Sequence, residues 1–373
     1  MSLLDVVLGA AVEQQASDVY LQSDSFVYFR VDGALLKTDM KLSRGDVEFL
    51  VDEVLQVQGA VTRLYELEEI DRSYVHKGSN GTTRWRVNVS LCLDGITVVF
   101  RRLREVQPNP AYYGVPERFL EVVSSVPYGL VVVAGPTGSG KSTTLAATIG
   151  WLSHRRPISI VTIEDPIEYL IPCGPESRCA MREVGRHTKS FDRALRAAMR
   201  QRPDVILVGE VRDPETALAA VQAAKTGHLV FTTLHTGAAS LVPFRIASMF
   251  PLERQRWILG ELADCLICAV VQLLVPGNDG RRVPAFEFFD TRSAAVREKI
   301  ATAPHVEVRK LLPSCGWTLE QYLEKLAQEN TISPETASTF KGVCEDNTLF
   351  CKTPGPPSLF GFGEGEGGDN KKE

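Results

Sequence analysis

The sequence predicts an α/β protein with a mixed α+β domain at the N-terminus and a larger domain built on a mainly parallel sheet. Short apolar stretches alternate with turn residues up to residue 104, whereas longer apolar runs alternate with helical patterns beyond residue 116. A glycine-rich phosphate-loop signature follows the first of these longer runs. The length of 373 residues suits two domains that each bury their own core.

The N-terminal domain is expected over residues 1–104. Strands are predicted where polar and apolar residues alternate, at residues 19–21, 26–31, 85–90 and 97–100. The turn pairs Asp32-Gly33 and Asp94-Gly95 adjoin two of these strands. Residues 43–58 place five aliphatic side chains on one helical face, so this domain combines strands with a helix.

Three prolines punctuate residues 105–116, which predicts a linker before a second domain over residues 117–350. Apolar runs predict strands at residues 130–134, 158–163, 205–208 and 229–234. One intervening helix is marked by Asp213 as N-cap, Pro214 at its first position and Gly227 just past its end. Helices are expected after Pro284. The Gly/Pro-rich residues 351–373 predict a disordered tail.

The composition limits the classes of partner. Forty-one basic and 46 acidic residues give a formal charge of −5, so no overall positive field would recruit nucleic acid or acidic lipid. The longest strongly apolar run, residues 266–275, is half the length that a bilayer span needs. Residues 1–5 lack the basic start of a signal peptide. We therefore expect a cytoplasmic protein with no direct membrane span and no specific nucleic-acid ligand.

A phosphate-binding loop is the strongest motif in the chain. The signature G-x-x-x-x-G-K-[ST] follows a predicted strand and opens a predicted helix; the residues expected to bind nucleotide are Gly135, Pro136, Thr137, Gly138, Ser139, Gly140, Lys141, Ser142 and Thr143. Glycines let backbone N–H groups converge on phosphate oxygens. Lys141 would bridge the β- and γ-phosphates and Ser142 would ligate Mg²⁺, so ATP and Mg²⁺ are the expected cofactors.

Polar side chains follow three other predicted strands. Glu210 follows residues 205–208, His235 follows residues 229–234, and three carboxylates, Glu164, Asp165 and Glu168, follow residues 158–163. Ligands of an open parallel sheet bind beyond the carboxyl ends of its strands, so these side chains should converge near Lys141. Each carboxylate could instead cap a helix, and His228 and His235 could be structural histidines.

Four ordered motifs give the chain a resemblance to the traffic ATPases of the type II/IV secretion superfamily. Residues 135–143 resemble the Walker A motif of these proteins, and T-I-E-D-P-I-E-Y at residues 162–169 resembles their Asp box. V-I-L-V-G-E-V-R-D at residues 205–213 is similar to their Walker B motif. T-G-H-L-V-F-T-T-L-H-T at residues 226–236 is similar to their His box.

The resemblance implies a PAS-like N-terminal domain, a RecA-like P-loop ATPase domain with C-terminal helices, and a homohexameric ring. Glu168 would be the catalytic glutamate that polarises water, and Glu210 would coordinate Mg²⁺ through water. His235 and Lys141 would complete the catalytic group. The residues with supporting roles would be Glu164, Asp165, His228 and Arg212.

Two arginines of the N-terminal domain match family positions from which arginines reach the phosphates as the ring closes. They are Arg86 in R-V-N and Arg101 in V-F-R. An arginine in this role stabilises the charge that develops on the γ-phosphoryl group. The alternative for each is a solvated arginine on a strand.

The chain resembles two branches of the superfamily. The retraction branch carries A-I-R-N-L-I-R-E after the ATPase core, and residues 295–300 match it loosely. The chain also resembles compact ATPases of type IVB (Dot/Icm-like) secretion and of conjugative transfer, which we slightly favour. Either branch implies a cytoplasmic motor docked on inner-membrane platform proteins, whose domains close about the linker. The alternatives are a RecA-like nucleic-acid motor and a nucleotide-gated scaffold with little turnover.

Overall fold

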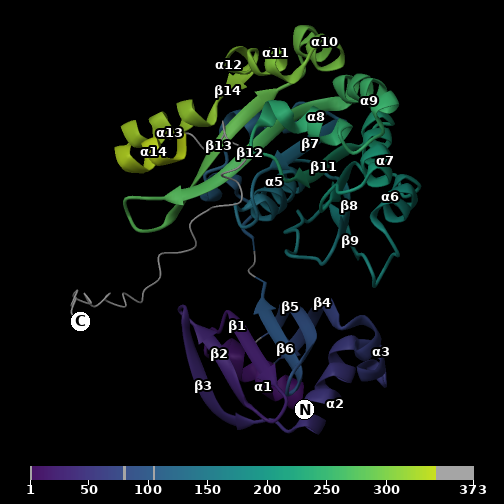
Figure 1. The fold of residues 1–373 in the computed structure, drawn as a ribbon, viewed down its shortest axis with the longest axis vertical. Helices are drawn as coiled ribbons and strands as arrows, with labels where there is room; N and C mark the ends of the chain where they lie inside the picture. The colour runs from purple at the N-terminus through teal and green to yellow at the C-terminus, as the bar shows by residue number, and fades with distance from the viewer. Residues whose placement is uncertain (1, 79–80, 104–105, 342–373) are drawn as a thin grey trace, which may run out of the picture.

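The computed structural model describes residues 2–78, 81–103 and 106–341 (Figure 1). These residues form an N-terminal domain on a six-stranded sheet and a larger domain on an eight-stranded sheet. The predicted order, α+β and then mainly parallel α/β, is confirmed. The predicted tail at residues 351–373 lies outside the described residues, as does the end of the predicted second domain.

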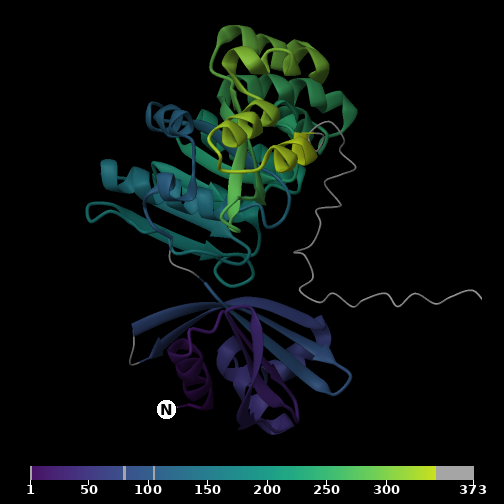
Figure 2. The same cartoon turned by 90° about the vertical axis from the view of Figure 1, so that its left-hand side faces the viewer.

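The N-terminal domain is an antiparallel sheet with helices on one face. The strand order is β3-β2-β1-β6-β5-β4. The strands are β1 (Asp18–Gln22), β2 (Phe26–Val31), β3 (Ala34–Lys41), β4 (Glu69–Gly78), β5 (Gly81–Cys92) and β6 (Gly95–Arg102). The helices are α1 (Leu3–Glu13), α2 (Arg44–Leu55) and α3 (Ala60–Leu67). In Figure 2 the sheet lies between these helices and the larger domain.

Side-chain alternation explains which face of this sheet meets the larger domain. Trp85 and Val87 of β5 and Phe100 of β6 are fully buried on the helix side. Successive strand residues point to opposite faces, so Arg86 and Arg101 share the other face. They are also direct neighbours across β5 and β6.

The larger domain has a parallel sheet with an antiparallel edge, in the order β14-β13-β12-β7-β11-β10-β8-β9. The strands are β7 (Gly129–Ala134), β8 (Ser159–Glu164), β9 (Arg178–Glu183), β10 (Val205–Val208), β11 (Leu229–Leu234), β12 (Leu266–Pro276), β13 (Arg282–Asp290) and β14 (Gly316–Trp317). Every strand from β12 to β9 in that order runs parallel to its neighbour. The four predicted strands of this domain are all present.

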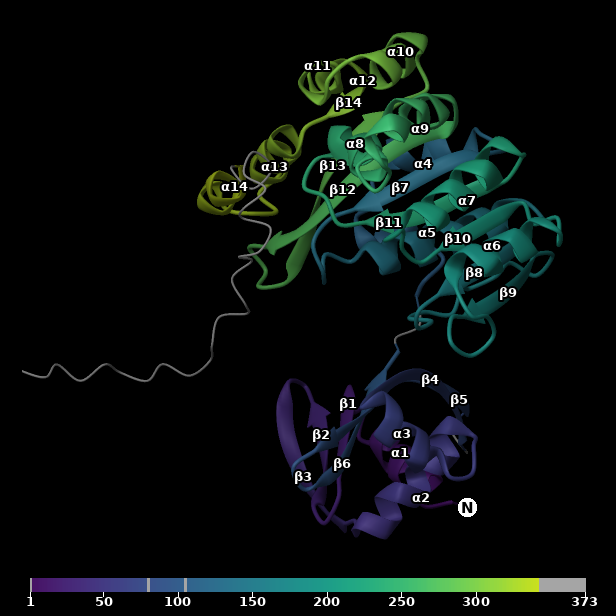
Figure 3. The same cartoon turned by 45° about the vertical axis from the view of Figure 1, so that its right-hand side comes forward.

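Helices cover both faces of the larger sheet (Figure 3). They are α4 (Glu117–Ser124), α5 (Lys141–Arg155), α6 (Phe191–Met199), α7 (Pro214–Lys225), α8 (Val242–Ala247), α9 (Leu252–Cys265), α10 (Ala294–Thr302), α11 (His305–Arg309), α12 (Leu312–Cys315), α13 (Leu319–Gln328) and α14 (Pro334–Lys341). Asp213 caps α7 by accepting a hydrogen bond from the Thr216 N–H at 2.7 Å, as predicted.

One prediction in this domain is wrong. The segment after Pro284 begins as strand β13, which pairs antiparallel with β12, and the helices start only at Ala294. The run Ala285, Phe286, Glu287, Phe288, Phe289 is buried on both faces of the sheet, so it shows no polar alternation. A run of this length that is apolar except for one buried glutamate does not distinguish a buried strand from a buried helix.

The segment predicted as a linker packs on the larger domain over most of its described length. Val106, Pro110 and Val115 are buried, and Val106 and Val115 belong to a core cluster of that domain. A short 3₁₀ helix spans Pro110–Tyr113.

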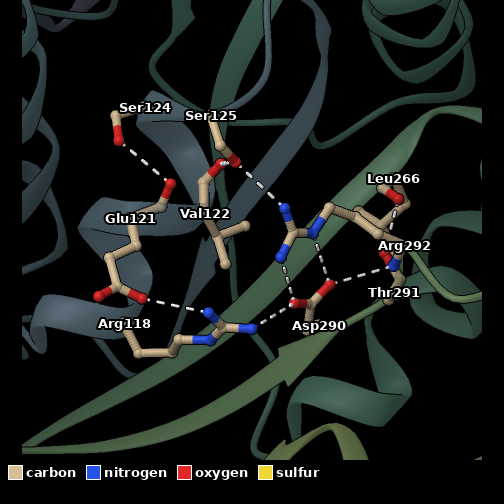
Figure 4. A network of polar contacts seen from close by, with 9 residues as sticks. All are labelled: Arg118, Glu121, Val122, Ser124, Ser125, Leu266, Asp290, Thr291 and Arg292. Carbon is tan, nitrogen blue, oxygen red and sulfur yellow. Dashed lines mark hydrogen bonds and ion pairs between the residues drawn. The ribbon is translucent and has the colours of Figure 1, made fainter.

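A polar network fastens α4 to the end of β13 (Figure 4). The Asp290 carboxylate accepts hydrogen bonds from Arg292 at 2.9 and 2.7 Å and lies 3.7 Å from Arg118. Arg292 also donates to Ser125 Oγ at 3.1 Å. Strand β13 pairs with β12, and β12 pairs with β7. This network therefore stabilises the end of the sheet opposite the phosphate loop.

Within the described residues, no helix has both the length and the apolar character that a bilayer span requires.

Candidate active site

The phosphate loop joins β7 to α5 and contains glycines at positions that only glycine can occupy. Gly135 has φ +139°, and a Cβ there would lie 2.3 Å from the Gln272 carbonyl oxygen. A Cβ at Gly140, where φ is +89°, would lie 2.9 Å from Gln272 Nε2. Gln272 of β12 also accepts a hydrogen bond from Thr144 Oγ1 at 2.8 Å. Strand β12 therefore supports the loop from the side.

Lys141 begins α5 and turns back over the phosphate loop. Its Nζ donates to the carbonyl oxygens of Gly135 and Pro136 at 3.0 and 2.8 Å. Burial lowers the pKa of Lys141 to about 8, while Glu168 and Glu210 act to raise it. Both carboxylates therefore lie within electrostatic range of the ammonium group, as the sequence predicted.

Strands β11 and β10 place His235 and Glu210 next to the loop. Strand β11 is the neighbour of β7, and His235 directly follows it. The pKa of His235 is lowered by partial burial and by the charge of Lys141, which favours the neutral imidazole. Glu210 lies one strand further along and pairs with Arg212 at 2.8 Å. Glu210 and Ser142 supply the hard oxygen donors that Mg²⁺ accepts, so these residues fit the expected metal.

Glu168 follows a strand that lies farther from the phosphate loop than the strands before His235 and Glu210. It follows β8, which is three strands from β7, or about 14 Å at the usual strand spacing. The segment after β8 turns back toward α5, where Thr143 Oγ1 and the Tyr169 hydroxyl are 3.0 Å apart in a hydrogen bond. This bond anchors the residue next to Glu168 on the first turn of α5.

Glu164 and Asp165, for which supporting roles are predicted, lie at the end of β8 and directly after it. Glu164 ends β8 with 8% of its surface exposed, and its Oε1 has no hydrogen-bond partner among the described residues. Burial raises the pKa of Glu164 to about 7. The pKa of Asp165 is also raised, first by burial and then by Glu183 and Glu210.

The structure brings one of the two predicted arginines to the site. Arg86 Nη1 lies 3.7 Å from Glu168 Oε1 of the same chain, and its Nε lies 4.0 Å from Asp71. Arg101 instead pairs with Asp18 at 2.9 Å inside the N-terminal domain. In this arrangement of the domains Arg101 therefore has a carboxylate partner away from the phosphate loop.

His228 is not part of the site, contrary to the prediction. It precedes β11, so the six residues of that strand, about 20 Å, separate it from His235. Its Nδ1 lies 3.0 Å from the carbonyl oxygen of Ala223 at the end of α7. Its position in a motif shared with His235 suggested a common site, but the two ends of one strand lie on opposite edges of a sheet.

Three supporting residues were missed by the sequence analysis: Gln272, Tyr169 and Glu183. Gln272 lies in an apolar run, where a lone buried amide was the available signal. Glu183 ends β9, whose six residues R-C-A-M-R-E gave too little apolar pattern to predict a strand.

Comparisons with known proteins identify the family of the chain. A family model described as type II/IV secretion system protein matches residues 1–300. The type IV pilus retraction ATPase PilT of Pseudomonas aeruginosa is 35% identical over 338 residues, which are 89% of this chain and 96% of the relative. The chain therefore belongs to the type II/IV secretion system protein family. It is an ATP hydrolase of the pilus and secretion class.

Two solved structures share the fold over nearly the whole chain. The X-ray structure of the Legionella pneumophila ATPase DotB has a TM-score of 0.83 and 30% identity and covers 90% of this chain and 94% of its own. The crystal structure of the pilus retraction motor PilT with bound ADP has a TM-score of 0.81 and 36% identity, with coverages of 91% and 96%. The chain thus resembles the retraction motor PilT and the ATPase DotB about equally in fold.

Substituting Gly135 by Ala should abolish turnover because the new Cβ would collide with the Gln272 backbone beneath the loop. We expect ATP hydrolysis to fall on the order of a hundredfold or more, the scale of a misplaced catalytic group. Gly227→Ala is a matched control, since Gly227 has φ +103° but no atom within 4 Å of an added Cβ. The control should lose about 1 kcal/mol of stability and keep its activity. Equal activities would contradict the close approach to Gln272.

The raised pKa of Glu164 predicts a pH-dependent stability. Between its ordinary value of 4.5 and about 7, the folded state keeps a proton that the unfolded chain has lost, so stability falls as pH rises through this range. Glu164→Gln should remove that fall and raise the unfolding free energy above pH 7 by roughly 1–3 kcal/mol. Thermal melts without nucleotide, between about pH 5 and pH 8, would measure it. The exposed Glu176→Gln is the control; a stability gain for Glu164→Gln that is the same at every pH would refute the assignment.

Proposed function

We propose that this chain is a homohexameric ring motor that hydrolyses ATP to drive a type IV secretion or pilus machine. The observation that carries the proposal is the convergence of four strand ends on one phosphate loop. Glu168 and Glu210 both act to raise the pKa of Lys141. The charge of Lys141 acts to lower the pKa of His235, and Glu210 acts to raise it. A binding scaffold needs the loop, whereas turnover needs the carboxylates as well.

The residues take distinct roles in this proposal. The backbone of residues 135–143 and Lys141 bind the phosphates, and Glu168 orients and polarises the attacking water. Ser142 and, through water, Glu210 would hold Mg²⁺, which neutralises phosphate charge when it is bound. Neutral His235 would contact the γ-phosphate, while Glu164, Asp165 and Arg212 support the carboxylates.

The N-terminal domain supplies arginine charge in this proposal. The 3.7 Å contact between Arg86 and Glu168 supports a role for Arg86 beside the γ-phosphate of its own chain. Arg101 shares the face of Arg86 and would reach the phosphates only after leaving Asp18. Since Val106 is buried in the larger domain, we propose that the chain from Val106 onward moves with that domain.

We propose that the motor is cytoplasmic and docks through protein partners on the inner-membrane face of its machine. The similarity to the pilus retraction ATPase PilT supports docking on a pilus or secretion machine. That similarity does not separate retraction from secretion, so the proposal names the machine class and leaves the direction of force open. The charge of −5 disfavours the alternative of a nucleic-acid motor.

The specific ATPase rate, measured against protein concentration with light scattering at each point, tests this proposal. Specific activity should rise as the hexamer forms, because neighbours complete or stabilise the closed sites. Lys141→Ala should lose at least about a hundredfold in turnover. Adding single-stranded DNA should leave the rate unchanged. Full activity in a monomer would overturn the ring motor, and strong stimulation by DNA would favour the nucleic-acid motor.

A further inference from the structure

Glu183 is a buried carboxylate that the catalytic chemistry described above does not use. It ends β9 with 1% of its surface exposed. Its Oε1 accepts a hydrogen bond from the backbone N–H of Ser73 at 3.3 Å, and its Oε2 accepts one from the backbone N–H of Ile167 at 3.4 Å. Ser73 belongs to the N-terminal domain, and Ile167 directly precedes Glu168. One carboxylate therefore joins the two domains at the catalytic segment.

Ser73 is available for this contact because β4 is the outer strand of the N-terminal sheet. Both backbone groups of Ser73 point away from β5, since its carbonyl oxygen accepts a hydrogen bond from Arg186 Nη1 at 3.3 Å. Arg186 Nη2 also donates to Gln56 Oε1 at 3.1 Å. The turn after β9 thus holds the edge of β4, and Figure 3 shows this turn above β4 and β5.

The neighbouring strand β5 contacts Glu168 directly, through Arg86. Ser73 and Arg86 are direct neighbours across β4 and β5. Ser73 is linked to the Ile167 N–H through Glu183, and Arg86 lies 3.7 Å from the Glu168 carboxylate. A shift of this cross-strand pair would therefore act on both the backbone and the side chain around Glu168.

The surrounding interface is loosely packed, so these polar contacts matter. Each hydrophobic cluster of the described residues draws its members from one domain. A cavity of about 540 Å³ lies beside the contact, lined by Ser73 and Arg84 from one domain and by Ile167 and Arg186 from the other, among further residues. The contact between the domains at this place therefore depends on hydrogen bonds that water can replace.

We propose that Glu183 is a positioning residue that couples the docking of the N-terminal domain to the placement of Glu168. When β4 is docked, Glu183 fixes the Ile167 N–H and so the segment that carries Glu168. When β4 moves away, Glu183 loses one of its two partners and the segment is freed to shift. The inference deepens the proposed function, because it assigns a control of turnover to the same site.

Breaking the contact from both sides tests this coupling. Glu183→Gln removes an acceptor, and Ser73→Pro removes the N–H while sparing the β4–β5 ladder, as edge strands allow. Each variant should bind ATP with a KM within about twofold of wild type and lose roughly ten- to a hundredfold in kcat. The double variant should be no slower than the slower single variant, because both changes break one link.

Controls separate this coupling from a general loss of structure. Lys77→Pro changes the same edge of β4, four residues from Ser73, and should keep the wild-type kcat. Arg186→Ala, an exposed substitution, should lower kcat in the same direction and provides a probe if Glu183→Gln fails to fold. Losses that multiply in the double variant, or an unchanged kcat in Ser73→Pro, would overturn the coupling while leaving the proposed function intact. Absence of turnover in the wild type would overturn both.

Discussion

The parallel pairing of β7, β11, β10 and β8 is the constraint on which the site depends. Parallel strands end at the same edge of a sheet, so strand direction alone brings the residues that follow them together. The phosphate loop, His235 and Glu210 occupy successive positions along this edge. Glu168 is the exception, because it starts about three strand spacings away and needs the Tyr169–Thr143 hydrogen bond to return to α5.

The larger domain alone does not complete the surroundings of Glu168. Arg86 of the N-terminal domain contacts Glu168 directly. Ser73 of the same domain is linked to the segment around Glu168 through Glu183. None of the hydrophobic clusters of the described residues spans the two domains, and domains joined without a shared apolar core can move relative to one another. Movable domains that both contact one catalytic residue suit a motor, because the placement of that residue then links hydrolysis to domain movement.

The strand ends of the site could be predicted from sequence because each signal was local. Apolar runs followed by carboxylates gave β8 and β10, and the glycine spacing gave the loop before α5. Strand β13 was missed because burial on both faces removed its alternation, and β9 was missed because half of its six residues are charged. The place of His228 depends on which end of β11 it adjoins. The place of Arg101 depends on its pairing with Asp18. Glu183 depends on a contact between domains, which no local pattern encodes.

Turnover by a Glu168→Gln variant shows whether the convergent carboxylates make this phosphate loop an ATP-hydrolysing site. Equilibrium binding of ATP and steady-state hydrolysis would be measured on the same preparation of wild type and variant. We expect nearly unchanged ATP affinity with turnover reduced by roughly a hundred- to ten-thousandfold, the usual contribution of a general base. Full turnover with Gln at this position would exclude Glu168 as the catalytic glutamate, because water activation would then depend on another group.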